Sequence, residues 1–182
     1  MEFKEQPRER FFSNRTLGKI ILFGLLLFGS ATVQTSFFPA VSIFPASPDL
    51  LLSAVIGIAL FDGERTGAVC GTAAGLLAVA LGGAGTAPLP VFYMLTGYFL
   101  GIFARVNFKK NLLSWLIYIS LGSVARAMLS LLVIVVTEQG MNLFTAFTRI
   151  ILPELLMTVA FSLPNYFLAR LVVMPFQKKD EV

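Results

Sequence analysis

The chain has 182 residues, of which 57% are hydrophobic and only 13% are charged, and its formal net charge is +4. A soluble domain of this size carries about 25% charged residues, so this chain has too few charges to cover its surface against water. The basic residues stand in short groups between apolar runs and form no continuous stripe, which argues against nucleic-acid binding and indicates a membrane protein.

Residue types that carry much of known catalysis are scarce. The sequence has no histidine and one cysteine, Cys70, so it offers no intrachain disulfide, no zinc site and no histidine-based catalytic centre. It has no carboxylates paired at useful spacing, and the glycine-rich stretch at 82–85 lacks the Lys and Ser/Thr of a phosphate loop. We therefore expect a protein that is not an enzyme and binds no cofactor or metal.

Residues 1–16 are polar and charged and are predicted to form a cytoplasmic tail. The apolar run 17–37 is long enough for a membrane-spanning helix, which needs about 20 residues. A signal peptide is the alternative, but no clear small-x-small cleavage site follows, so we interpret the run as a retained helix. Three prolines in 38–48 then predict a turn or an extended loop.

The next apolar run predicts a helix at 49–61, with Asp49 able to cap its start. Asp62, Glu64 and Arg65 interrupt the run. A re-entrant hairpin is the alternative to two spans here, but it would place these three charges deep in the bilayer, at a cost of several kcal/mol. Two spans with a turn at the surface are favoured.

The remaining apolar runs complete an all-α, polytopic protein with six transmembrane helices. Near the start of the fifth helix, Trp115 and Tyr118 are predicted to lie at the membrane interface, which amphipathic aromatic residues favour. The transmembrane domain is predicted over 17–173 and a cytoplasmic tail over 174–182, with the last four helices at 66–81, 88–104, 112–136 and 149–173.

The basic residues predict the orientation. With six spans, all but one of the flanking basic residues fall on one side, and the positive-inside rule makes that side cytoplasmic. Both termini then lie in the cytoplasm, and the expected location is a bacterial plasma membrane. The residues on this side are Lys4, Arg8, Arg10, Arg15, Lys19, Arg65, Arg105, Lys109, Lys110, Lys178 and Lys179, against Arg149 on the other.

Glycines recur at four-residue spacing in two neighbouring helices. Gly67, Gly71 and Gly75 share one face of a helix, as do Gly97 and Gly101 in the next. Such faces let another backbone approach closely. Packing within the chain is one interpretation, and a docking groove for a partner's transmembrane helix is the other.

Three charged residues fall within predicted spans, where charges are expensive and often functional. Arg126 lies roughly 21 Å from the cytoplasmic end of its helix, while Asp49 and Glu154 lie near the outer ends of theirs. We expect Arg126 to pair with Glu154, with Asp49 or with both. The pairing either fixes helix register or forms a polar site that faces a cavity or partner.

Five stretches of the sequence carry a resemblance to a known family. In chain order they are Val33-Gln34-Thr35-Ser36-Phe37-Phe38-Pro39, Pro48-Asp49-Leu50-Leu51-Leu52, the glycine-spaced helix that ends in Gly75-Leu76-Leu77, Leu89 to Gly101, and Leu152-Pro153-Glu154-Leu155-Leu156-Met157-Thr158 leading to Pro164 and Arg170. Taken together, over about residues 17–177, they resemble the rod shape-determining protein MreD family of bacterial inner-membrane proteins. The third stretch departs from the family: many members carry an Asp just after it, where this chain has Ala78-Val79.

The resemblance implies a non-enzymatic subunit of the cell-elongation complex, which regulates peptidoglycan synthesis and cell shape. It implies association with a bitopic MreC-like protein and, directly or through it, with MreB and the peptidoglycan synthases. The implied fold is similar to substrate-binding subunits of energy-coupling-factor transporters. The sequence leaves the formation of a homodimer open.

Two other functions remain as alternatives. The first is a substrate-binding subunit of an energy-coupling-factor vitamin transporter. Against it, the first helix lacks a small-xxx-small pattern for docking a transport partner, and polar residues for a pocket are few. The second is a membrane enzyme or ion channel, which the scarcity of polar residues in the spans disfavours.

Overall fold

The computed structural model describes residues 14–37, 48–82, 88–107, 112–137, 147–148 and 152–177. Almost all of these residues are helical, and none of them forms a strand, so the predicted all-α class is confirmed. Some predictions fall outside the described residues. They concern the tails at 1–13 and 178–182, the Pro-containing stretch at 38–47, the turn at 83–85, the loop at 138–146, and Lys109, Lys110 and Arg149.

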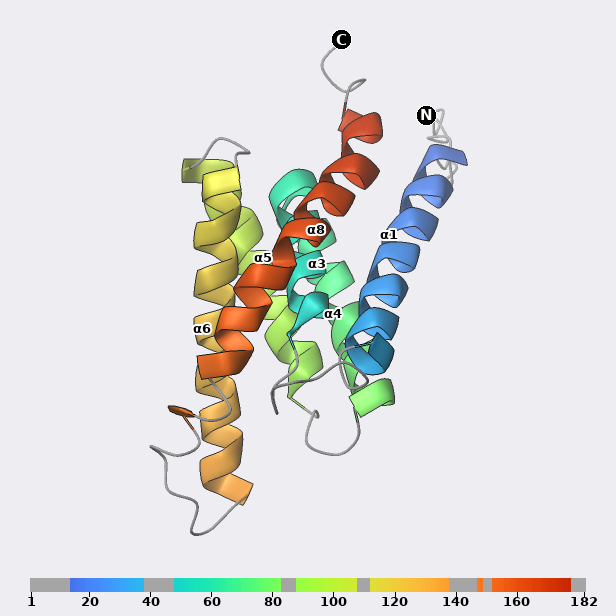
Figure 1. The fold of residues 1–182 in the computed structure, drawn as a ribbon. Coiled ribbons are helices and arrows are strands. Elements are labelled where there is room, and N and C mark those ends of the chain that lie inside the picture. The colour runs from blue at the N-terminus through green and yellow to red at the C-terminus, as the bar shows by residue number, and fades with distance from the viewer. Residues whose placement is uncertain are drawn as a thin grey trace, which may run out of the picture.

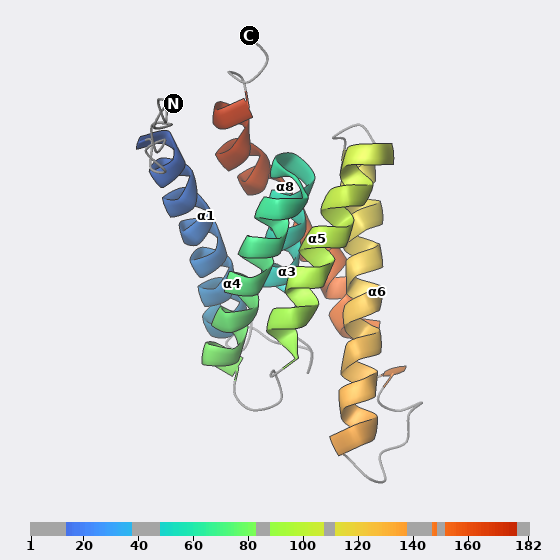
Figure 2. The same ribbon diagram turned by 180° about the vertical axis from the view of Figure 1, so that it is seen from behind.

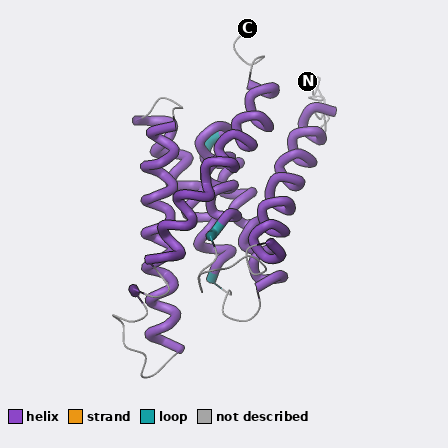
Figure 3. Tube along the Cα trace, in the orientation of Figure 1, coloured by secondary structure: helices purple, strands orange, loops and turns teal. Residues whose placement is uncertain are grey.

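Each predicted span corresponds to a helix in the described part of the chain, with ends displaced by about one turn or less. Helices α1 and η1 together, α4, α6 and α8 are long and apolar enough to cross a membrane, which suggests a membrane protein. Helix α3 and the apolar part of α5 are shorter. The helices, coloured in Figure 3, are α1 (Asn14–Thr32) with η1 (Val33–Phe37), α3 (Leu50–Asp62), α4 (Glu64–Gly82), α5 (Leu89–Asn107), α6 (Leu112–Thr137) and α8 (Leu152–Gln177).

Helix α3 lies in the middle of the bundle, between α1 on one flank and α6 on the other (Figures 1 and 2). It contacts every other long helix that the structure describes. Successive helices alternate in direction, so the N-terminal end of α1 and the C-terminal end of α8 lie at the same end of the bundle (Figure 1). The α3–α4 turn lies toward that end too.

The composition of α3 explains its central place. Its residues 50–61 are all buried, and they are apolar on every side except for Ser53. A helix that is hydrophobic all round has no face to turn outward, so neighbours enclose it. Its 13 residues span about 20 Å, against about 30 Å for a bilayer core. The charged α3–α4 turn lies at one end of the bundle, so the other end of α3, at Asp49, stops inside the protein.

The α3–α4 turn needs only one residue outside the helices. Gly63 has φ of 96°, a left-handed conformation that glycine adopts without strain, and its N–H donates to the Ala59 carbonyl at 3.0 Å. Lys19 of α1 pairs with Asp62 at 2.5 Å on this turn. On the other side of the turn, Arg105 of α5 pairs with Glu64 at 3.0 Å. The predicted surface turn is therefore a charged junction of four helices.

The spaced glycines form a tight interface between α4 and α5. A Cβ atom at Gly71 would collide with the Tyr93 carbonyl, and one at Gly75 would collide with the Pro90 backbone. Gly97 faces the Gly67 carbonyl in the same way, and Gly101 faces the backbone of Glu64. The two helices thus use these faces on each other, and no room remains there for a partner's helix.

We predict that Gly71→Ala destabilises the protein by about 1–3 kcal/mol, because the α5 backbone must move to admit the methyl group. Unfolding by SDS titration in mixed micelles, followed by circular dichroism, measures the change. Gly24→Ala in α1 is the matched control: its new Cβ meets nothing within 4 Å, so helix propensity alone should stabilise it by up to about 1 kcal/mol. Equal stability of the two variants would contradict the tight interface.

Candidate functional site

A buried polar site is built around Asp49 at the N-terminus of α3. The Asp49 side chain is the N-cap: its Oδ1 accepts a hydrogen bond from the Leu52 N–H at 2.9 Å. This position suits a carboxylate, because the first N–H groups of a helix lack partners and the helix dipole is positive there. Asp49 is only 3% exposed, so the helix start lies in the interior.

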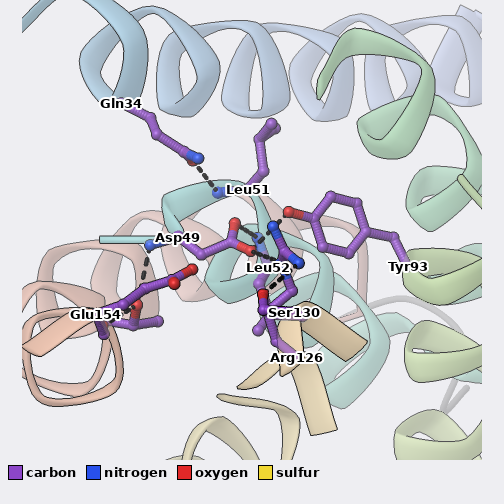
Figure 4. A network of polar contacts seen from close by, with 9 residues as sticks. Gln34, Asp49, Leu51, Leu52, Tyr93, Arg126, Ser130 and Glu154 are labelled. Atoms are coloured by element: carbon purple, nitrogen blue, oxygen red, sulfur yellow. Dashed lines mark hydrogen bonds and ion pairs between the residues drawn. The ribbon is translucent and has the colours of Figure 1, made fainter. Parts of the chain in front are cut away.

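Two side chains from other helices converge on the second carboxylate oxygen of Asp49 (Figure 4). The hydroxyl of Tyr93, on α5, donates to Oδ2 at 2.6 Å, a length typical of a hydrogen bond to a charged acceptor. Arg126 of α6 donates from Nε to the same oxygen at 3.3 Å and forms an ion pair with it. Arg126 also donates from Nη1 to Ser130 Oγ at 3.0 Å, one turn further along α6.

The backbone donors at the start of α3 have partners from α8 and η1. The Asp49 N–H donates to Thr158 Oγ1 at 2.9 Å, and the Thr158 hydroxyl in turn donates to the Glu154 carbonyl at 2.7 Å. The Leu51 N–H donates to Gln34 Oε1 at 3.1 Å (Figure 4). Side chains of η1, α5, α6 and α8 therefore all bond to this one helix end. We call this set the polar site: Gln34, Asp49, Tyr93, Arg126, Ser130 and Thr158.

A second polar contact follows one turn further into the bundle. Asn165 of α8 donates from Nδ2 to the Leu50 carbonyl at 3.0 Å and to Ser53 Oγ at 2.6 Å. Ser53 itself donates to the Leu50 carbonyl at 2.8 Å. These three residues are buried, so α8 is joined to the first turn of α3 at two levels.

Glu154 lies beside the polar site without joining the ion pair. Within the described residues, Arg126 pairs with Asp49 and not with Glu154. Glu154, Arg126 and Ser123 line a cavity of about 10 Å³ between α3, α6 and α8, close to the least volume that holds one water molecule. Ser123 is buried and its Oγ has no hydrogen-bond partner among the described residues.

The structure brings together two of the three charged residues predicted for this site, Asp49 and Arg126, and sets Glu154 next to them. Four further residues of the site were not predicted: Gln34, Tyr93, Ser130 and Thr158. The sequence does contain a signal for them: the first N–H groups of a helix that begins inside an apolar bundle need partners, and the few polar residues within the apolar runs are the available ones.

The polar site joins helices and offers little for chemistry. Its one carboxylate accepts hydrogen bonds at both oxygens and is paired with its one cation. The described residues contain no cluster of His, Cys, Asp and Glu that could hold a metal ion. The arrangement satisfies buried polar groups and bonds four helices to the start of α3.

No family model matches the sequence, and no curated protein or solved structure is significantly similar to it.

We predict that Asp49→Ala destabilises the protein by roughly 3–5 kcal/mol, because it removes the buried carboxylate and leaves the half-buried Arg126 cation without its ion pair. Loss of the N-cap adds to this effect. In Asp49→Ala/Arg126→Leu the unpaired charge is gone, so stability should recover in part. A double-mutant cycle on SDS unfolding then gives a coupling energy of about 1–3 kcal/mol.

The pair of Glu64 and Arg105 is the control for this cycle, because the Arg105 side chain is 76% exposed. The cycle with Glu64→Gln and Arg105→Gln should give about 1 kcal/mol of coupling or less. The same small coupling at Asp49 and Arg126 would show that the buried pair does not organise the helices.

Proposed function

We propose that this protein is a non-enzymatic membrane subunit of the bacterial cell-elongation complex, as its resemblance to the MreD family implies. In this role it binds a bitopic MreC-like protein through helix contacts. Through that protein, or directly, it acts with MreB and the peptidoglycan synthases to control cell-wall synthesis and cell shape.

One observation carries the proposal: four of the five stretches behind the resemblance meet in the polar site. Gln34 comes from the first stretch, Asp49 from the second, Tyr93 from the fourth and Thr158 from the fifth. The remaining stretch, on α4, packs against α5 through Gly75 and Pro90. Stretches far apart in the chain thus bond to one helix end, and this shared structural role supports the proposal.

The proposed topology has six spans with both termini in the cytoplasm, in a fold similar to substrate-binding subunits of energy-coupling-factor transporters. The alternating helix directions support it (Figures 1 and 2). So does the position of Lys19 and Arg105, whose ion pairs with Asp62 and Glu64 lie at the α3–α4 turn. Helix α3 is short for a span, but the other helices enclose it, so its N-terminal end at Asp49 need not reach the bilayer surface.

In this role the bundle acts as a rigid body that presents an apolar outer surface to partner helices. The glycine faces of α4 and α5 are used internally, so the partner surface lies elsewhere. Large apolar side chains are exposed on several helices, and the outer side of α6 is rich in them. The most exposed of these on α6 are Leu113, Met128 and Leu132.

The vitamin-transporter alternative has weaker support. A small-molecule site needs about 300 Å³ or more with a few converging polar groups. The cavity at the polar site is about 10 Å³, and the side chains of Asp49 and Arg126 bond to each other there. Tight binding of a vitamin by the purified protein would favour this alternative.

We expect the full-length protein, purified in a mild detergent, to copurify with an MreC-like bitopic protein of the same organism. Depletion of the protein should turn rod-shaped cells into round or swollen ones, as microscopy can record. An unrelated membrane protein of similar size, carrying the same affinity tag, is the control for non-specific copurification. Absence of the partner together with normal shape after depletion would refute the proposal.

Labelling of single cysteines tests the six-span topology. In a Cys70→Ala background, we expect Ser36→Cys and Thr137→Cys to react with a membrane-impermeant maleimide in intact cells. Asn14→Cys and Asn107→Cys should react only after permeabilisation, because six spans place these helix ends in the cytoplasm. Labelling of Asn14→Cys and Asn107→Cys from opposite sides would rule out six spans.

A further inference from the structure

A small cavity lies next to the Asp49–Arg126 pair, between α3, α6 and α8. Its volume of about 10 Å³ is close to the least that holds one water molecule. Most of the residues that line it have polar side chains, although the helices around it are largely apolar. The polar ones are Asp49 at the start of α3, Ser123 and Arg126 on α6, and Glu154 and Thr158 on α8.

Ser123 lines this cavity with a hydroxyl that lacks a partner. The residue is 4% exposed, and its Oγ makes no hydrogen bond to any residue that the structure describes. Buried hydroxyls are normally hydrogen-bonded, because a buried polar group without a partner loses the free energy of its hydration. The Ser123 hydroxyl therefore indicates a small hydrogen-bonding molecule in the cavity that it lines.

Glu154 and Arg126 present further hydrogen-bonding groups to the same cavity. Glu154 lies beside Asp49 in Figure 4, and no hydrogen bond or ion pair joins its carboxyl group to another described residue. A guanidinium has five N–H groups, and Arg126 uses one on Asp49 and one on Ser130. Together with Ser123, these two residues can supply the roughly three hydrogen bonds that a buried water molecule makes.

The charges around the cavity select a neutral occupant. A cation would meet the Arg126 guanidinium, and an anion would meet the carboxyl groups of Asp49 and Glu154. The occupant must accept a hydrogen bond from Arg126 and also donate one to Glu154. At a volume of about 10 Å³, water is the molecule that is small enough to do both.

We propose that one water molecule occupies this cavity and bridges Ser123, Arg126 and Glu154. It connects Glu154 to the Asp49–Arg126 pair, and so it joins α8 to α6 at the level where α3 begins. The water site does not depend on the proposed function, because it follows only from the cavity and from the groups that line it.

The experiment is a set of crystal structures of the full chain, grown in a lipidic mesophase at a resolution that shows ordered water. In wild type, one density peak should lie about 2.5–3.2 Å from Ser123 Oγ, from a Glu154 carboxyl oxygen and from an Arg126 nitrogen. Ser123→Val should lose the peak, because valine offers no hydrogen bond and adds a second γ-carbon. Ser120→Val is the matched control: it makes the same change on α6 at a residue that does not line this cavity, so the peak should remain.

Stability gives a second readout, which needs no crystals. In a double-mutant cycle on SDS unfolding, Ser123→Val and Glu154→Gln should be coupled by about threefold or more in the unfolding equilibrium constant, because the bridge needs both side chains. The cycle of Ser120→Val with Glu154→Gln should show a coupling of less than about twofold.

Four results would each overturn the proposal. The first is the absence of the peak from wild type, and the second is its persistence in Ser123→Val. The third is a peak about 2.3–2.6 Å from several oxygen atoms, which is the range for a bound calcium ion. The fourth is a coupling between Ser123→Val and Glu154→Gln no larger than that of the control cycle.

Discussion

The start of a helix lies inside an apolar bundle, and most of the structure follows from that constraint. The first amides of α3 have no partner in their own helix, and they are buried, so water does not replace that partner. The Asp49 carboxylate, Thr158 and Gln34 accept hydrogen bonds from these amides. The carboxylate brings a charge, which Arg126 and Tyr93 then compensate. Since these partners belong to different helices, satisfying one helix end also fixes how the bundle is assembled.

Two kinds of contact hold the helices together: close backbone contacts at glycines, and hydrogen bonds between buried polar groups. Lipid tails are as apolar as leucine, so helices in a membrane gain little from hydrophobic burial against one another. Between α4 and α5 the chain relies on glycine, where Gly71 and Gly97 let the backbones approach closely. Such contacts are dense but have little directionality. The hydrogen bonds of the polar site have defined directions, and they give α3, which is almost uniformly apolar, a specified rotation and depth.

The helices could be predicted because apolar runs are visible in the sequence. Which helix or side chain each of them contacts could not be predicted. Four-residue spacing places Gly67 and Gly71 on one face but does not say what covers that face. Packing within the chain and docking of a partner's helix are therefore both compatible with the sequence, and the structure shows that α5 covers the face. The Asp49–Arg126 pair could be predicted as one of the alternatives for Arg126, because few charged residues lie in the predicted spans. Tyr93 was not assigned, since an aromatic residue in an apolar run has an ordinary alternative in packing. Trp115, expected at the interface, is 0% exposed and packs against Tyr166, in part because Gly57 leaves room for its ring.

The first turn of α3 is held by side chains from both ends of the chain. The Leu50 carbonyl accepts a hydrogen bond from Asn165 of α8. The next residue, Leu51, donates to Gln34 at the end of the α1–η1 helix. The same turn carries the Asp49 cap, whose side chain accepts from the Leu52 N–H. Since α1–η1 and α8 both bond to this turn, their spacing follows from the helix end that Asp49 caps, and a change at Asp49 also acts on the described α1–η1 helix, to which Asp49 itself makes no hydrogen bond.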